Sequence, residues 1–108
     1  MDIYSYYPYD AALGNINALD YYFSVKADQQ TKVAYEASDF LWAKTADVSP
    51  TRNPVDLSFS HKLSKVRVNV KSEVDTLNSQ LATAVVSVVN TNHSASINIS
   101  NGNITVDN

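Results

Sequence analysis

Hydrophobic and polar residues alternate along much of the chain, and this period of two predicts β-strands. The clearest case is residues 94–106, where two alternating runs flank Asn101-Gly102. An Asn-Gly pair in this setting favours a two-residue type I′ turn, because both central residues need a positive φ. The pattern therefore predicts a hairpin that sets these residues opposite each other: Ile99 with Ile104, and Ile97 with Val106.

Four further runs of β-forming residues predict strands. They are residues 2–9, 21–26, 40–44 and 84–89. The stretch 33–44 is ambiguous, because some of its apolar residues also have helical spacing; we favour an extended chain through Ser38-Asp39 before a short strand. Residues 10–20, 28–32 and 49–54 are typical of loops and turns, and residues 73–83 of a loop or a helical turn.

Between residues 55 and 71 the alternation changes phase. Up to Leu63 the apolar residues hold odd positions, whereas the valines of 66–70 hold even ones. A β-bulge or a break at Ser64-Lys65 would account for the change, since a bulge adds one residue and reverses the faces. We therefore expect two strands or one long bulged strand, with Phe59 facing the core.

Seven or eight short strands with little helix indicate an all-β protein, an antiparallel sandwich or barrel. The chain has 108 residues, enough for one domain. It has no cysteine and only two glycines, which excludes thiol chemistry and glycine-rich phosphate loops. A net charge of −3 gives little support for nucleic-acid binding. No apolar run approaches membrane-spanning length, and no signal-peptide pattern is present.

No constellation supports an enzyme, a metal site or a cofactor. His61 has no second histidine close to it in the sequence, and the chain has no cysteine, so a metal shell cannot be completed there. We therefore expect a buried or half-buried structural histidine, bonded to a backbone carbonyl. Lys65, Arg67 and Lys71 alternate with valines, as on a solvated sheet face; a basic ligand stripe is the less favoured alternative.

Six of the seven tyrosines lie in the first 22 residues. The simplest interpretation is cross-strand aromatic packing. The alternative is an aromatic platform for sugar rings, formed by Tyr4, Tyr6, Tyr7 and Tyr9, which would make the chain a small surface carbohydrate-binding module.

Several segments together resemble the N-terminal domain of the Mfa-like fimbrillin family, subunits of the type V pili of Bacteroidota. The matching runs are residues 2–9, 23–29, 38–44 and 55–66, and the most distinctive is L-x-F-x-H-x-L-S-K at 57–65. The positions carried over are expected to be structural: Ser38, Asp39, Trp42, Leu57, Phe59, His61, Leu63, Ser64 and Lys65.

The resemblance implies a transthyretin-like β-sandwich at the cell surface, in a fimbria or at the outer membrane. It implies a non-enzymatic pilus subunit, or a tip or anchor adhesin, that joins other pilin subunits by β-strand addition, a mode in which a free sheet edge supplies backbone hydrogen bonds. Host or bacterial surface glycans or proteins are further partners to expect. We expect residues 1–108 to be a single, partial domain, an incomplete sandwich, because the family's signal peptide, lipid-bearing cysteine and second domain have no counterpart here.

Overall fold

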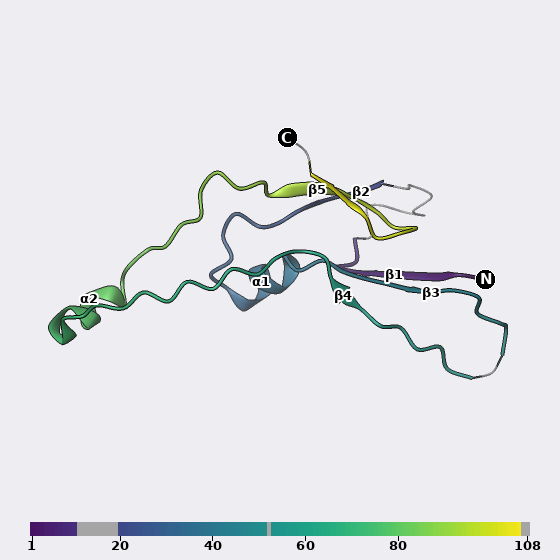
Figure 1. Ribbon diagram of the computed structural model, residues 1–108, viewed down its shortest axis with the longest axis horizontal. Coiled ribbons are helices and arrows are strands. Elements are labelled where there is room, and N and C mark those ends of the chain that lie inside the picture. Colours follow the sequence, from purple (N-terminus) through teal and green to yellow (C-terminus); the bar gives the residue numbers. More distant parts are fainter. Residues whose placement is uncertain (11–19, 52, 107–108) are drawn as a thin grey trace.

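The computed structural model describes residues 1–10, 20–51 and 53–106 (Figure 1). Most of the regular structure is β-strand, in short elements. The strands are β1 (Ile3–Tyr7), β2 (Asp20–Ser24), β3 (Leu41–Thr45), β4 (Ser60–His61), β5 (Ser94–Asn98) and β6 (Ile104–Val106). The helices are α1 (Lys32–Ala37), the 3₁₀ turn η2 (Asp75–Leu77) and α2 (Asn78–Leu81).

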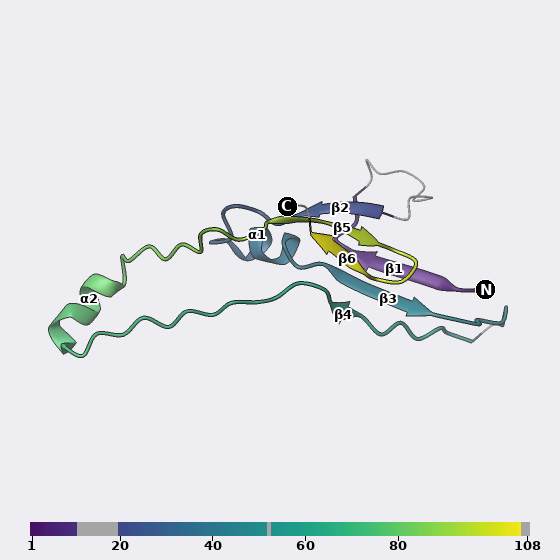
Figure 2. The same cartoon turned by 45° about the horizontal axis from the view of Figure 1, so that its top comes forward.

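The strands form two three-stranded antiparallel sheets, ordered β1-β3-β4 and β2-β5-β6. Figure 1 shows the two sheets as separate layers, and Figure 2, a turned view, shows α1 near one end of both. The β3–β4 and β5–β6 pairings join consecutive strands, whereas β1–β3 and β2–β5 join strands that are not consecutive. The chain therefore passes between the two sheets three times, after β1, after β2 and after β4. The expected all-β sandwich is thereby confirmed.

The core lies between the two sheets and is rich in aromatic rings. Phe40, just before β3, is fully buried, and its ring centroid lies 5.1 Å from that of Phe23 and 5.5 Å from that of Tyr21. Tyr6 adds a ring 5.3 Å from Tyr21. The buried cluster consists of Tyr21, Phe23, Phe40, Ile97 and Ile99, with Tyr6, Val25, Trp42, Leu63 and Ile104 packed against it.

Residues 64–92 leave this sandwich as a long projection, which we call the arm. Its two extended segments join the sandwich to η2 and α2 at the far tip (Figure 1). The arm gives the molecule principal extents of 64 × 34 × 22 Å and a radius of gyration of 18.9 Å. A compact domain of this length has a radius of about 13 Å, so the arm contributes little to the core.

The hairpin at residues 94–106 is present, but its predicted register is wrong by two residues. Ile97 pairs with Ile104 and Ala95 with Val106, so the loop spans residues 99–102. The Asn98 side chain holds this longer loop by accepting bonds from the Ser100 amide (3.0 Å) and hydroxyl (2.6 Å). A shift of two residues leaves every side chain on its expected face.

The extended chain favoured over residues 33–39 is also wrong, because α1 occupies residues 32–37. Thr31 caps this helix: its hydroxyl accepts a bond from the Ala34 amide at 3.2 Å, the usual role of an N-cap threonine. The strand expected after it does form as β3, and the helical alternative at residues 73–83 is realised by η2 and α2.

Three other predicted strands do not form as expected. Residues 55–59 contain no strand, and Phe59 is 45% exposed instead of facing the core. Residues 66–70 and 84–89 are extended but unpaired and exposed, so neither the bulged strand nor the buried strand is present. An isolated extended segment lacks the neighbour that its backbone groups need, which is why alternation alone did not produce a strand here. Most of the loop expected over 10–20 lies outside the described residues.

Candidate functional site

Ser38 and Asp39 lie where α1 turns into β3, and Ser38 is the polar residue buried at this junction. Its hydroxyl donates to the Ala34 carbonyl at 2.8 Å and accepts from the Lys26 amide at 2.9 Å. Ser38 therefore ties the end of α1 to the segment that follows β2. With both bonds directed at the backbone, the hydroxyl has a structural role and is not placed as a nucleophile.

Asp39 is hydrogen-bonded to His61 beside the β3–β4 pairing. The His61 Nδ1 atom lies 2.9 Å from the Asp39 carboxylate. The side chain of His61 is 70% exposed, so the expectation of a buried histidine bonded to a backbone carbonyl is wrong. An aspartate 22 residues away in sequence became its partner only because β3 and β4 place Leu41 opposite His61.

Trp42 links the two sheets. Its Nε1–H donates to the Ile99 carbonyl, in the β5–β6 loop, at 2.8 Å. Gly102 lies directly against the indole, with φ +72, and the Lys62 ammonium lies 5.2 Å from the centre of the indole ring. The side chains of Ser38, Asp39, Trp42 and His61 thus each join segments that are separate in the sequence.

The remaining residues of the distinctive run separate from this group. Leu57 and Phe59 are exposed at 37% and 45%. Leu63 packs on the core, whereas Ser64 and Lys65 begin the arm, with the Lys65 ammonium 5.1 Å from the centre of the Tyr35 ring.

The four N-terminal tyrosines do not share one exposed face. Tyr6 packs into the core, and burial raises its pKa above the ordinary 10.0, as it does for Tyr21. Tyr4, Tyr7 and Tyr9 are exposed, but Tyr4 and Tyr7 lie on opposite faces of β1 by the alternation of a strand.

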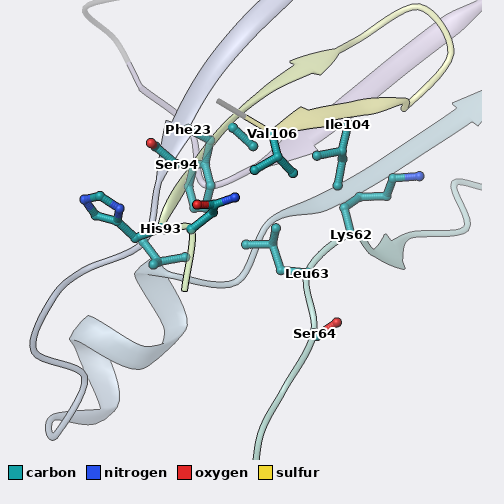
Figure 3. Close-up of a pocket in the computed structure, with 11 residues that line it drawn as sticks. Phe23, Lys62, Leu63, Ser64, His93, Ser94, Ile104 and Val106 are labelled. Carbon is teal, nitrogen blue, oxygen red and sulfur yellow. The ribbon is translucent and has the colours of Figure 1, made fainter. Parts of the chain in front are cut away.

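A pocket of about 220 Å³ opens between the sheets where the arm leaves and rejoins the sandwich (Figure 3). Leu63 points from one side toward Ile104 and Val106 of β6 on the other, while the polar ends of Lys62 and Ser64 point away. Where the arm rejoins the sandwich, the chain is held by the Val25 amide, which donates to the His93 carbonyl at 2.9 Å. The pocket is apolar inside and polar at its rim.

The free edge of β6 borders this pocket. In sheet β2-β5-β6, β6 has β5 as its only strand neighbour among the described residues. The Asn98 amide donates to the Asn103 carbonyl at 2.8 Å. Because hydrogen-bonded and non-bonded pairs alternate in an antiparallel ladder, Ile104 and Val106 turn their backbone groups away from β5. Their side chains line the pocket.

The edge formed by β1 has a different character. Asp2 pairs with Lys44 at 3.2 Å and accepts a bond from the Asp47 amide at 3.1 Å. The Asp47 bond and the Lys44 ammonium hold the pKa of Asp2 below its ordinary value, and the Asp2 carboxylate raises the pKa of Lys44. Such charges at an edge disfavour pairing with another strand.

Within the ranges that the structure describes, no three potential metal-ligating side chains are grouped. Of the helices in those same ranges, none has the length and hydrophobicity to cross a membrane.

Comparison with known families decides the class of the protein. The family model described as fimbrillin-like matches residues 1–108. The chain belongs to the fimbrillin-like family. This is a family of structural pilus subunits with a surface-exposed, fimbrial location, so the sequence resemblance is confirmed. Searches of curated proteins and of solved structures returned no match.

The sequence did not single out the pocket of this fimbrillin-like chain. Its lining comes from four separate segments. In the sequence, residues such as Phe23 and Leu63 are only apolar positions of an alternating pattern, with no sign that they line a pocket. The alternation of Ile104 and Val106 was visible, but alternation does not tell which strand lies at an edge.

Proposed function

We propose that this fimbrillin-like subunit joins its neighbour by accepting an extended segment along the edge of β6, with side chains entering the adjacent pocket. The observation that carries the proposal is the coincidence of a free strand edge and an apolar pocket at Ile104 and Val106. Anchorage at the outer membrane and an adhesin role at a fimbrial tip belong to the same proposal, as extensions of family membership.

The geometry of a β-strand supports this pairing. A segment bonded to the outward backbone groups of Ile104 and Val106 would place every second side chain toward the pocket. The inner wall is made by aliphatic and aromatic groups, so aliphatic side chains at alternate positions suit it. The polar rim at Lys62 and His93 would lie beside the peptide backbone.

Two of the other three sheet edges, β1 and β4, suit a strand less well. At β1 the Asp2–Lys44 pair places charge along the edge, and β4 has only the two residues Ser60–His61. The β6 edge offers both unpaired backbone groups and an apolar pocket. Side chains buried in that pocket add a hydrophobic contribution to the binding free energy that backbone hydrogen bonds alone do not supply.

The test uses a fluorescein-labelled octapeptide of alternating valine and threonine, titrated with the full chain and followed by fluorescence anisotropy. We expect saturable binding and a rise in the melting temperature of the chain. Ile104→Lys should abolish both effects, because it places a charge in the pocket. Thr105→Lys is the matched control, since its side chain points to the opposite face of the same strand.

Near-ultraviolet circular dichroism and Trp42 fluorescence will show whether Ile104→Lys remains folded. If it does not, Val106→Lys serves instead, because Val106 is 46% exposed and contributes less to the core. Equal peptide binding by the folded lysine variants and by the wild-type chain would refute the proposal, as would absence of binding to the wild-type chain.

A further inference from the structure

The arm carries two extended segments of contrasting chemistry. Residues 65–71 combine three valines with Lys65, Arg67 and Lys71, whereas residues 82–92 contain no charged side chain. Among the described residues, no backbone hydrogen bond joins residues 65–71 to residues 85–89. Both segments therefore present unpaired backbone groups and β-branched side chains to solvent.

Residues 85–89 read Val-Val-Ser-Val-Val, the same in both directions. The four valines are exposed at 86%, 53%, 60% and 74% in chain order. A symmetric sequence matters for antiparallel pairing, because two copies related by a twofold axis at the central residue meet identical residues at every position.

We propose that two copies of this chain associate through their arms, by antiparallel pairing of residues 85–89 about a twofold axis at Ser87. Ser87 then lies opposite Ser87 of the second copy. Val85 of one copy lies opposite Val89 of the other, on the face that carries Ser87. Val86 lies opposite Val88 of the other copy, on the opposite face. Every valine meets a valine, and β-branched pairs directly opposite each other stabilise an antiparallel ladder.

Charge explains why this segment, and not its neighbour in the arm, forms the contact. Self-pairing of residues 65–71 about Val68 would set Lys65 against Lys71, and like charges directly opposite each other are destabilising. Lysine at a strand edge also disfavours edge-to-edge association. The uncharged segment has neither obstacle, and the contact is isologous, so it closes as a dimer.

This contact is independent of the strand acceptor, since it uses neither β6 nor the pocket. Residues 85–89 lie in the arm, between α2 and the point where the chain rejoins the sandwich (Figure 2). Ser87 is exposed and belongs to no helix or strand, so substitutions there leave the sandwich intact.

The first experiment exploits the absence of cysteine from the chain. Ser87→Cys introduces a single thiol that faces its own copy across the twofold axis, and mild oxidation should convert it to a disulfide-linked dimer. Ser79→Cys, exposed in α2 at the tip of the same arm, is the control and should stay largely monomeric. Equal cross-linking of the two variants would overturn the register.

The second experiment uses charge, with sedimentation equilibrium as the readout. Ser87→Lys and Ser87→Glu should each weaken the wild-type dimer by about tenfold or more, since like charges then meet at the axis. Mixing the two variants in equal amounts should restore association.

A wild-type chain that stays monomeric at every concentration tested would overturn the proposal. So would a monomer whose amides at 65–71 and 85–89 are protected from hydrogen exchange, because the two segments would then pair within one molecule. Failure of the mixed variants to associate would also reject it.

Discussion

The Trp42 indole rests directly on Gly102, so that a side chain at position 102 would displace the indole ring. A Cβ at position 102 would lie 2.8 Å from the Cδ2 and Cε3 atoms of the indole. The backbone of Gly102 is left-handed, with φ +72, and only glycine adopts such a φ without strain. This contact and the bond from Trp42 to the Ile99 carbonyl join the loop of one sheet to a strand of the other.

Gly102→Ala should therefore lower the free energy of unfolding by about 2 kcal/mol, from backbone strain and displacement of the indole. Urea denaturation followed by the fluorescence of Trp42, the single tryptophan, measures this change. Asn103→Ala, at the neighbouring exposed position, should change stability by no more than about 0.5 kcal/mol. Equal stability of the glycine and alanine forms would show that the contact does not exist.

Phe40→Ala should lower the free energy of unfolding by about 3–5 kcal/mol, because it removes the fully buried ring at the centre of the aromatic cluster. Phe59→Ala should cost less than about 1 kcal/mol, since Phe59 is 45% exposed. Chemical denaturation compares the two; Phe40→Leu replaces the alanine variant if that chain does not fold. A larger loss at Phe59 would mean that residues 55–61 face the core after all.

Ser38→Ala should lower the free energy of unfolding by about 1–3 kcal/mol. The change leaves the Lys26 amide without its side-chain acceptor in a part-buried place. Ser58→Ala is the matched control: Ser58 is exposed and should tolerate the change within about 0.5 kcal/mol. Denaturation midpoints and amide exchange at Lys26 provide the readout. Unchanged exchange at that amide would contradict the assigned bond.

Acid should weaken the β1 edge through Asp2. The pKa of Asp2 is lowered in the folded chain from 3.8, so its contribution to stability is present above that value. It is lost as the pH falls through the lower folded pKa. Asp2→Asn should therefore reduce the loss of thermal stability between neutral pH and acid, with the larger difference between the two chains at neutral pH. A difference in melting temperature between the two chains that stays the same at every pH would reject this role.

The sequence predicted best where a local signal and a tertiary partner agreed. The strands near residues 3–7, 41–45 and 94–98 form as expected, and the hairpin at Asn101-Gly102 is present. The register of the hairpin differed from the prediction because the Asn98 side chain and the Trp42–Ile99 hydrogen bond favour a longer loop. The Asn101-Gly102 pair, on which the prediction rested, gives no information about either interaction. The helix at residues 32–37 was the less favoured alternative for an ambiguous stretch, although Thr31 supplies a helix cap.

For the candidate site, the sequence identified Ser38, Asp39, Trp42 and His61 but not how they act. The Asp39–His61 pair depends on the β3–β4 register, and the pocket depends on four segments that meet only in three dimensions. The alternating valines of the arm are the opposite case, a local pattern without the predicted structure. Their pattern predicts a strand, but no neighbouring strand pairs with them within the described structure.

By itself, the sequence determined the all-β class, the absence of thiol chemistry and the fimbrillin-like family, because these follow from residue types, alternation and local runs. The tertiary structure decided which strands lie at edges, which apolar residues are buried and where the pocket opens. Burial and edge position are properties of the neighbours a segment acquires on folding, and alternation along one segment is the same whether or not a neighbour is there.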